Sequence, residues 1–359
     1  MFRRIALLPL IALLSGSPVL AQQPKPAAAT GTSLAMPKQD SAIVLDAFKT
    51  APAAVDAMAP DARTAFAQKL ANELYAILSR VGSPTGQTGG AANATYADAV
   101  PQVKKLIDTH ALLQRATEGY GFTKASFPPS DIDNFEISDM HVTHPRSDIL
   151  VLRYKVKAPQ SSQIDQKTIM SSDARPEMTV LLWNQTARQW RIVSSANFNT
   201  PIAQICGQAA PDASKKPRGD GAGNATDLDI AKRQIQRLQS LIEHDDLRQI
   251  VHDEIQVQYA GGAGFTGSKA VLARHAPTVS KVVNSDFQTR RTGDILVVRF
   301  NNTVKDHVVD QVAYSEVKLP RLVTLLRGPD AQWKVIAFAG FTFPKAIPAG
   351  TACVKPTAR

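Results

Sequence analysis

The sequence predicts an α+β protein that contains two tandem copies of one folding unit, each with N-terminal helices followed by antiparallel strands. The first observation is a hairpin that occurs twice, in residues 178–206 and in residues 322–353. Each copy ends on a cysteine, and the matching landmarks lie 143 residues apart: Trp190 and Trp333, Phe198 and Phe341, Pro201 and Pro344. A self-match at constant spacing, with a turn between two apolar runs, indicates that a folding unit has been duplicated.

The second observation is that the duplication extends upstream of this hairpin. GFT at 121–123 returns at 264–266, and DILVLRY at 148–154 returns as DILVVRF at 294–300. The Ser-Asp pair at 138–139 returns at 285–286, so Asp139 and Arg153 recur as Asp286 and Arg299. The first copy is the more degenerate, because no strand equivalent to the one expected at 255–259 is recognisable in it.

The first 40 residues predict export. Arg3 and Arg4 precede an apolar run that ends in small residues, so residues 1–21 have the features of a secretory signal peptide. Residues 22–40 are rich in Ala, Pro, Gln and Lys and predict a flexible tether. No later stretch reaches the roughly 20 apolar residues that a spanning helix needs. We therefore expect a periplasmic or secreted protein with no transmembrane segment after removal of the signal.

Composition and charge narrow the class of partner. With 359 residues, 44% apolar and 20% charged, the chain has an ordinary globular composition and exceeds what one hydrophobic core usually serves. The formal net charge of +10 comes from Lys and Arg residues that are scattered, with few aromatic residues among them. A basic balance without a basic stripe predicts no nucleic-acid partner.

The first unit is expected over residues 41–206. Apolar residues recur at helical spacing from Pro60 to Gly82, and a second helical pattern covers 96–118. Residues 83–94 are polar and Gly-rich and predict a loop. Strands are expected at 135–143 and 149–156, where apolar residues alternate.

The second unit is expected over residues 227–353, after a linker at 207–226 that has little apolar surface to bury. A helical stripe covers 227–244, and a short helix is expected through 247–251. The expected strands are 255–259, 282–289, 295–300, 313–318, 322–326 and 333–338. In the last strand Trp333, Val335 and Ala337 alternate with Ile336 and Phe338, so both faces are apolar and we expect both to be covered.

The order of elements in the second unit resembles that of NTF2-like domains, in particular the SnoaL-like and DUF4440-like branch. The residues that carry the resemblance are LIEHDDLRQIVHDEIQVQY, GFTGSKAVLARHAP, SDFQTRRTGDILVVRF and LLRGPDAQWKVIAF. The resemblance implies two cone-shaped domains, each a curved antiparallel sheet around helices, that pair through their outer sheet faces as an internal pseudo-dimer. That superfamily includes isomerases, dehydratases, epoxide hydrolases and non-catalytic binding domains, so fold alone does not determine function.

Four residues of the second unit are candidates for a ligand-binding pocket. Asp286 and Arg299 lie on adjoining strands, where they could form an isomerase-like site or a solvent-side cross-strand pair. Arg299 could also be a long side chain at a sheet–sheet contact. Tyr259 and Tyr314 lie where pockets of this superfamily receive their lining, although a tyrosine there can simply complete the core.

No metal or cofactor is expected. His244 and His252 lie among acidic residues, but eight residues place them about 80° apart on a helix. His141 and His144 belong to a strand end and a turn, and no set of four ligands with zinc spacing is present. Nucleophile-elbow, phosphate-loop and paired CxxC motifs are also missing from the sequence.

Cys206 and Cys353 are predicted to form a disulfide. They are the only two cysteines, they end equivalent hairpins, and the expected export places them where thiols are oxidised.

Two functions follow from these observations. The favoured one is an exported, non-catalytic module of tandem domains that binds a small apolar ligand or a periplasmic partner protein. The competing one is an isomerase or dehydratase in the second unit, with Asp286 as base and Tyr259 or Tyr314 as donor.

Overall fold

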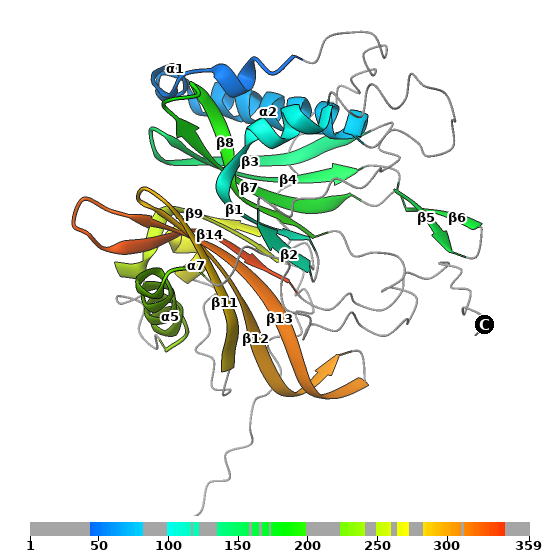
Figure 1. Cartoon of the computed structure of the whole chain (residues 1–359), viewed down its shortest axis with the longest axis vertical. Coiled ribbons are helices and arrows are strands. Elements are labelled where there is room, and N and C mark those ends of the chain that lie inside the picture. The colour runs from blue at the N-terminus through cyan, green and yellow to red at the C-terminus, as the bar shows by residue number, and fades with distance from the viewer. Residues whose placement is uncertain are drawn as a thin grey trace, which may run out of the picture.

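The computed structural model describes residues 44–81, 99–115, 118–121, 135–157, 160–164, 167–171, 174–198, 223–240, 249–259, 264–272, 283–309 and 312–341. These residues form an α+β fold with two six-stranded sheets and few helices, consistent with the cones that the resemblance implies (Figure 1). The expected signal peptide and tether and most of the expected linker, together with Cys206 and Cys353, lie outside the described residues.

The two sheets have the same strand order. The first is β2–β1–β8–β7–β4–β3, and the second is β10–β9–β14–β13–β12–β11. In each, one internal pair is parallel (β1 with β8, β9 with β14) and the other pairs are antiparallel. The strands of the first sheet are β1 (Ile107–Arg115), β2 (Glu118–Gly121), β3 (Glu136–Arg146), β4 (Ile149–Lys157), β7 (Arg175–Asn184) and β8 (Gln189–Asn197). Those of the second are β9 (Val251–Tyr259), β10 (Gly264–Thr266), β11 (Val283–Thr292), β12 (Ile295–Val309), β13 (Val312–Arg327) and β14 (Trp333–Gly340).

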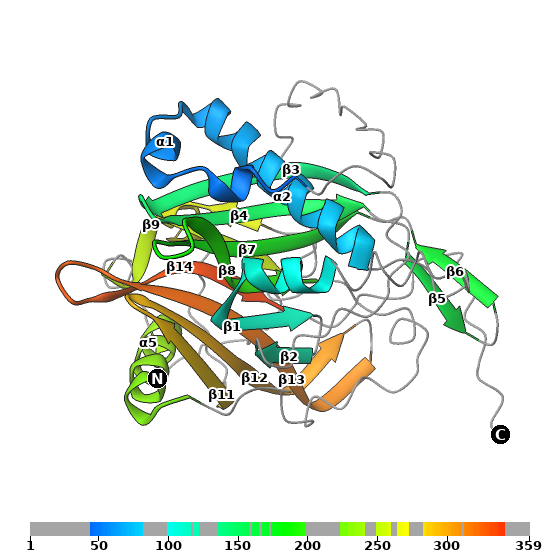
Figure 2. The same cartoon turned by 45° about the horizontal axis from the view of Figure 1, so that its top comes forward.

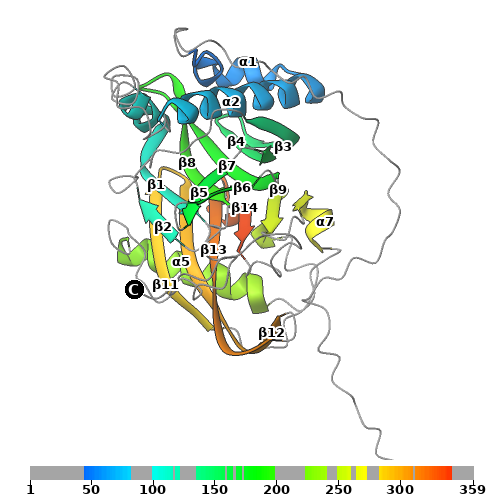
Figure 3. The same cartoon turned by 90° about the vertical axis from the view of Figure 1, so that its right-hand side faces the viewer.

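Each sheet has a helix on the face that turns away from the other sheet. On the first sheet this helix is α2 (Pro60–Val81), preceded by η1 (Ala47–Lys49) and α1 (Pro52–Asp56); on the second it is α5 (Ala225–Ser240), with the short α7 (Ser268–Leu272) nearby. Figures 2 and 3 show α2 across the first sheet and α5 on the far side of the molecule, which gives the layer order helix, sheet, sheet, helix. A separate hairpin, β5 (Gln160–Ile164) with β6 (Lys167–Ser171), projects from the side of the molecule.

The two sheets pack against each other through their remaining faces. One buried cluster contains residues of both sheets: Leu112, Ile149, Val151, Met178, Val180, Val193, Ala196, Phe198, Ile295, Val297, Leu322, Leu326, Ile336, Ala337, Ala339 and Phe341. The repeat-equivalent Phe198 and Phe341 stack on each other, with ring centroids 4.5 Å apart and an angle of 17° between planes. Two apolar faces that would otherwise be wetted are thus removed from water, which stabilises the contact.

The predicted helix at 96–118 is wrong in its second half. Residues 99–106 are helical, but Ile107–Arg115 is strand β1, the strand that the sequence did not reveal. Its neighbours Leu112 and Leu113 belong to different cores, one between the sheets and one beneath α2. Because both faces are buried, the strand lacks the polar–apolar alternation that would distinguish it from a buried helix.

Two expected strands at 313–318 and 322–326 are one strand, β13, which continues through Pro320. The proline ring removes one donor, but the Pro320 carbonyl still accepts a hydrogen bond from the Phe341 amide at 3.1 Å. Helix α5 begins two residues before the expected start of the second unit, where the Asn224 side chain accepts a hydrogen bond from the Asp227 amide at 2.8 Å.

The expected alternation in β14 is interrupted by a bulge at Ile336, where Thr324 pairs with Ala337 and Leu325 with Val335. Ala337 therefore faces the first sheet together with Ile336, while Phe338 packs on the inner side of its own unit. The first unit has the same bulge, because Val180 pairs with Ser194 and Leu181 with Ile192. Both faces of the strand are nevertheless covered, as expected.

None of the described helices is long and apolar enough to cross a membrane.

Candidate ligand-binding site

Tyr259 lies at the end of β9 on the inner face of the second sheet. Its ring contacts Phe265 and Phe338, with centroid distances of 6.3 and 6.0 Å. On the same inner side Phe287 stacks on Phe300 at 5.3 Å. All five rings belong to, or pack on, the buried cluster of the second unit, so this interior is aromatic.

Arg321 joins this interior and was not recognised from the sequence. The side chain is buried, and its Nη1 donates hydrogen bonds to the carbonyls of Pro320 at 2.9 Å and Phe341 at 2.6 Å. Burial lowers the pKa of Arg321 to about 10, and nearby Tyr259 opposes this shift. Burial raises the pKa of Tyr259, and Arg321 acts in the opposite direction. The only sequence signal was an arginine inside the apolar run LPRLVTLL.

Arg299 does not line this interior. It lies on the same strand face as Ile295 and Val297, which pack between the sheets, and only 2% of it is exposed. Its Nε donates a hydrogen bond to Oε1 of Gln114 in the first unit at 2.5 Å. Burial lowers the pKa of Arg299 to about 10, with Asp286 acting against this shift. Of the three alternatives that the sequence left for Arg299, the structure shows the long side chain at a sheet–sheet contact.

Asp286 lies outside the cone of the second unit. It is exposed at a bulge of β11 and accepts hydrogen bonds from Ser285 Oγ at 2.8 Å and from Asn301 Nδ2 at 2.9 Å. Asn301 is two residues beyond Arg299 on β12 and so shares its outer face. Asp286 and Tyr259 are therefore on opposite faces of the sheet. Tyr314 lies on β13 opposite His307, and its side chain is outside the described set.

Arg153, the repeat equivalent of Arg299, makes the reciprocal contact. Its Nε donates a hydrogen bond to Oε1 of Gln256 in the second unit at 3.2 Å. Each unit thus sends one buried arginine to a glutamine on the parallel-paired strand of the other, β1 or β9. A buried guanidinium is costly without partners, so these residues are tied to the contact between sheets.

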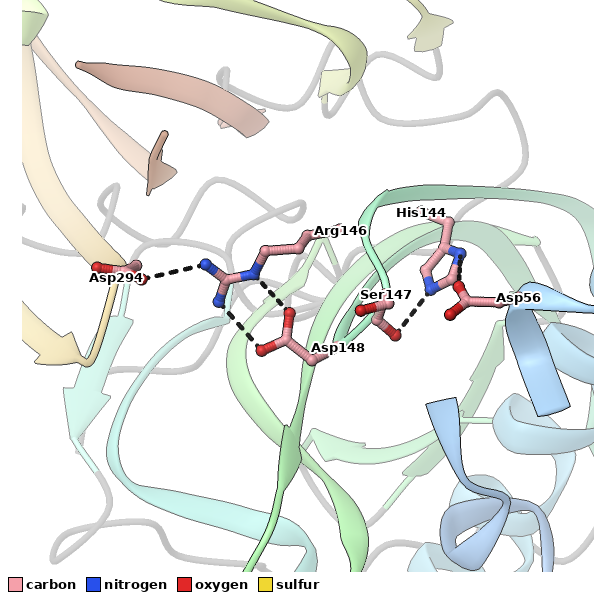
Figure 4. A network of polar contacts seen from close by, with 6 residues as sticks. All are labelled: Asp56, His144, Arg146, Ser147, Asp148 and Asp294. Carbon is pink, nitrogen blue, oxygen red and sulfur yellow. Dashed lines mark hydrogen bonds and ion pairs between the residues drawn. The ribbon is translucent and has the colours of Figure 1, made fainter. Parts of the chain in front are cut away.

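A further polar network joins the turns of the two units (Figure 4). Arg146 forms two hydrogen bonds to Asp148, at 2.6 and 3.1 Å, and one to Asp294 at 3.2 Å, the repeat equivalent of Asp148. Nearby, His144 donates from Nε2 to the Ser147 carbonyl at 3.0 Å, and its Nδ1 lies 3.5 Å from Asp56. One guanidinium therefore bridges equivalent carboxylates of the two units.

The first unit contains a buried carboxylate that sequence reasoning missed. Glu177 accepts hydrogen bonds from Tyr75, from Tyr154 at 3.0 Å and from Asn197 at 2.5 Å. Burial raises the pKa of Tyr154 strongly, and the Glu177 charge adds to this. The cavity next to Tyr154 measures about 10 Å³, room for one water, whereas ligand pockets typically measure about 300–1,000 Å³. In this conformation the carboxylate fixes the core of the first unit.

Among the described residues, the histidines form no metal centre. His141 lies 3.1 Å from Asp139, and His252 Nδ1 accepts a hydrogen bond from the Glu254 amide at 3.1 Å. His244 lies outside the described residues. Across the part of the chain that the structure describes, no group of three or more His, Cys, Asp or Glu side chains could hold a metal ion.

No protein-family model matches the sequence, and no curated protein matches it. Solved structures similar to this chain include an NTF2-like protein from Cytophaga hutchinsonii, with 23% identity over 33% of this chain and 99% of that one, TM-score 0.26. An NTF2-like protein of unknown function from Pseudomonas putida has 18% identity over 38% and 100%, TM-score 0.29. A candidate ketosteroid isomerase from Shewanella frigidimarina has 15% identity over 34% and 95%, TM-score 0.26. These neighbours are NTF2-like and ketosteroid-isomerase-like proteins, the superfamily that the sequence resembles.

Proposed function

We propose that this chain is an exported, non-catalytic binding module whose second unit takes a small apolar ligand against the aromatic interior around Tyr259. One observation carries the proposal: the inner face of the second unit presents five aromatic rings, while Asp286 and Arg299 lie on the outer face. Aromatic side chains offer large apolar area to a ligand, and Arg321 and the Tyr259 hydroxyl add the few polar groups that orient one.

The proposal includes an internal pseudo-dimer, in which each unit supports the other. The stacking of Phe198 on Phe341 and the reciprocal contacts of Arg153 and Arg299 support this pairing. The first unit acts as the structural partner, because its interior is filled around Glu177 and the adjoining cavity is too small for a ligand.

An isomerase or dehydratase that uses Asp286 as its base is disfavoured, because proton abstraction requires the base within hydrogen-bond reach of the bound substrate. Asp286 lies on the opposite sheet face from Tyr259, where it accepts a hydrogen bond from Asn301. Asp286→Asn should therefore leave ligand binding unchanged.

The test uses a neutral, fluorescent apolar probe, N-phenyl-1-naphthylamine, titrated into the mature chain. Gly340→Ala is an informative variant, because a Cβ at this position would lie 2.5 Å from the Tyr259 ring and would force the ring to move. Tyr259→Ala and Gly340→Ala should both weaken probe binding several-fold. Phe135→Ala, a partly buried aromatic of the first unit, is the matched control and should leave binding unchanged. Equal binding by all four proteins would refute the proposed site.

A further inference from the structure

A cavity of about 490 Å³ lies in the second unit, at the other end of β14 from Tyr259. Its lining includes one face of α5 together with Arg291, Arg327 and Trp333. Residues 226, 230, 233, 234 and 237 recur at three- and four-residue steps, so one face of α5 forms one wall. Trp333 begins β14, whereas Tyr259 pairs with Gly340 at its end, so the two regions are distinct.

Among the described residues, the lining has four arginines and no aspartate or glutamate. Arg291 is held in place, because its guanidinium lies 5.3 Å from the Trp333 ring centroid and its Nε donates to the Gly293 carbonyl at 2.9 Å. Asp227 lies 3.4 Å from Arg291 and offsets part of that charge. Four guanidinium groups around one concavity produce a strongly positive potential, and their planar donors match the oxygens of phosphate.

The equivalent place in the first unit is closed by its own chain. Trp190, the counterpart of Trp333, donates from Nε1 to the Thr50 carbonyl at 2.8 Å, and Phe48 is buried in the same cluster. The amide of Ala47 donates to Glu73 of α2 at 3.0 Å, which fixes this segment over the helix. In the first unit, a segment of the chain thus packs against the tryptophan, whereas in the second unit the equivalent tryptophan borders an arginine-lined cavity.

We propose that this cavity binds the phosphate group of a small organic phosphate, with the four arginines as its hydrogen-bond donors. This site is separate from the aromatic interior, so neither proposal depends on the other.

Isothermal titration calorimetry of the mature chain at low salt tests the site with three probes: glycerol 3-phosphate, inorganic phosphate and glycerol. We expect glycerol 3-phosphate and inorganic phosphate to bind, and glycerol, which has no phosphate group, not to bind. Arg233 and Arg327 are exposed, so the double variant Arg233→Gln/Arg327→Gln should fold. It should lower the affinity for both phosphate compounds about tenfold or more, because two charge-assisted contacts are lost.

A control variant separates the site from general attraction of anions. Arg188→Gln removes an exposed arginine from the equivalent hairpin of the first unit and should change neither affinity. The proposal is overturned if the wild-type chain fails to bind glycerol 3-phosphate, or if Arg188→Gln weakens binding as much as the double variant.

Discussion

At the residue scale, the most informative side chains are Arg153 and Arg299, which the sequence marked as equivalent and of which Arg299 was a candidate ligand-binding residue. Both are buried between the sheets, and each donates to a glutamine of the other unit. A buried guanidinium stays charged at neutral pH even where burial lowers its pKa to about 10, as in Arg299. Its free energy therefore depends on the hydrogen bonds that replace water.

The Arg299–Gln114 contact should show strong coupling in a double-mutant cycle. Gln114→Leu leaves the buried guanidinium without this acceptor and should cost about 3 kcal/mol of the free energy of unfolding. Adding Arg299→Met should recover part of that loss, because the charge is then gone. Urea unfolding of the four proteins measures the coupling; strictly additive effects would show that the contact contributes little.

Glu73 should make stability depend on pH. Burial raises its pKa above the ordinary 4.5, against the opposing effects of the Ala47 amide and Lys69. The folded form then binds the proton more tightly than the unfolded form, so the contribution is fully present below pH 4.5 and is lost as pH rises through the raised pKa. Glu73→Gln should flatten the change in Tm between about pH 4 and pH 7. If the variant keeps the wild-type dependence of Tm on pH, other titrating groups cause that dependence.

At the scale of elements, the repeated bulges are the main feature. Asp139 and Asp286 occupy equivalent bulges in β3 and β11, with φ of 53° and 56°. Positive φ is tolerated by Asp and Gly but strained for β-branched residues. The sequence signal was the repeated Ser-Asp pair, whose backbone role was not evident from charge alone.

Substitutions at Asp139 separate backbone strain from lost side-chain contacts. Asp139→Gly and Asp139→Val both remove the contacts to Lys155 and His141, but only valine is strained at this φ. We expect the valine variant to be less stable than the glycine variant by roughly 1–2 kcal/mol in thermal or urea unfolding. Equal stabilities would mean that the strand relaxes and the bulge is not maintained.

At the scale of the whole molecule, the contact between sheets decides whether the units fold separately. Phe341→Ala removes a ring that stacks on Phe198 and should cost roughly 3–5 kcal/mol. Because the cluster contains residues of both sheets, we expect both units to unfold in a single shared transition. Tryptophan fluorescence and circular dichroism would monitor this transition. Phe135→Ala, away from this contact, is the control. Two separate transitions in the wild-type chain would contradict the proposed pseudo-dimer.

The disulfide between Cys206 and Cys353 stays a prediction, since both residues lie outside the described residues. The stacking of Phe198 on Phe341 supports it, because these equivalent residues precede the two cysteines and meet each other. On a chain-entropy model a bridge closing so long a loop contributes about 5 kcal/mol. Intact mass after alkylation, with and without reduction, measures it; two alkylated thiols in the unreduced protein would exclude the bridge.

The sequence by itself determined the duplication, helix α2, most strand positions and the apolar character of both faces of β14. These features depend on local periodicity and on internal self-similarity, which one chain displays directly. Strand β1 was missed because burial on both faces removes alternation, and the bulge at Ile336 was missed because a single inserted residue has no composition signal.

Only the tertiary structure decided which candidate residues meet. Tyr259 faces the interior, whereas Asp286 and Arg299 face the other side of the sheet. Successive side chains of a strand point to opposite faces, so a shift of one residue moves a side chain to the other side. Arg321, Glu177 and the arginine-lined cavity depend on contacts between residues far apart in the chain. Sequence periodicity assigns residues to faces, but the packing of one sheet against another decides whether a face becomes a ligand site or an interface.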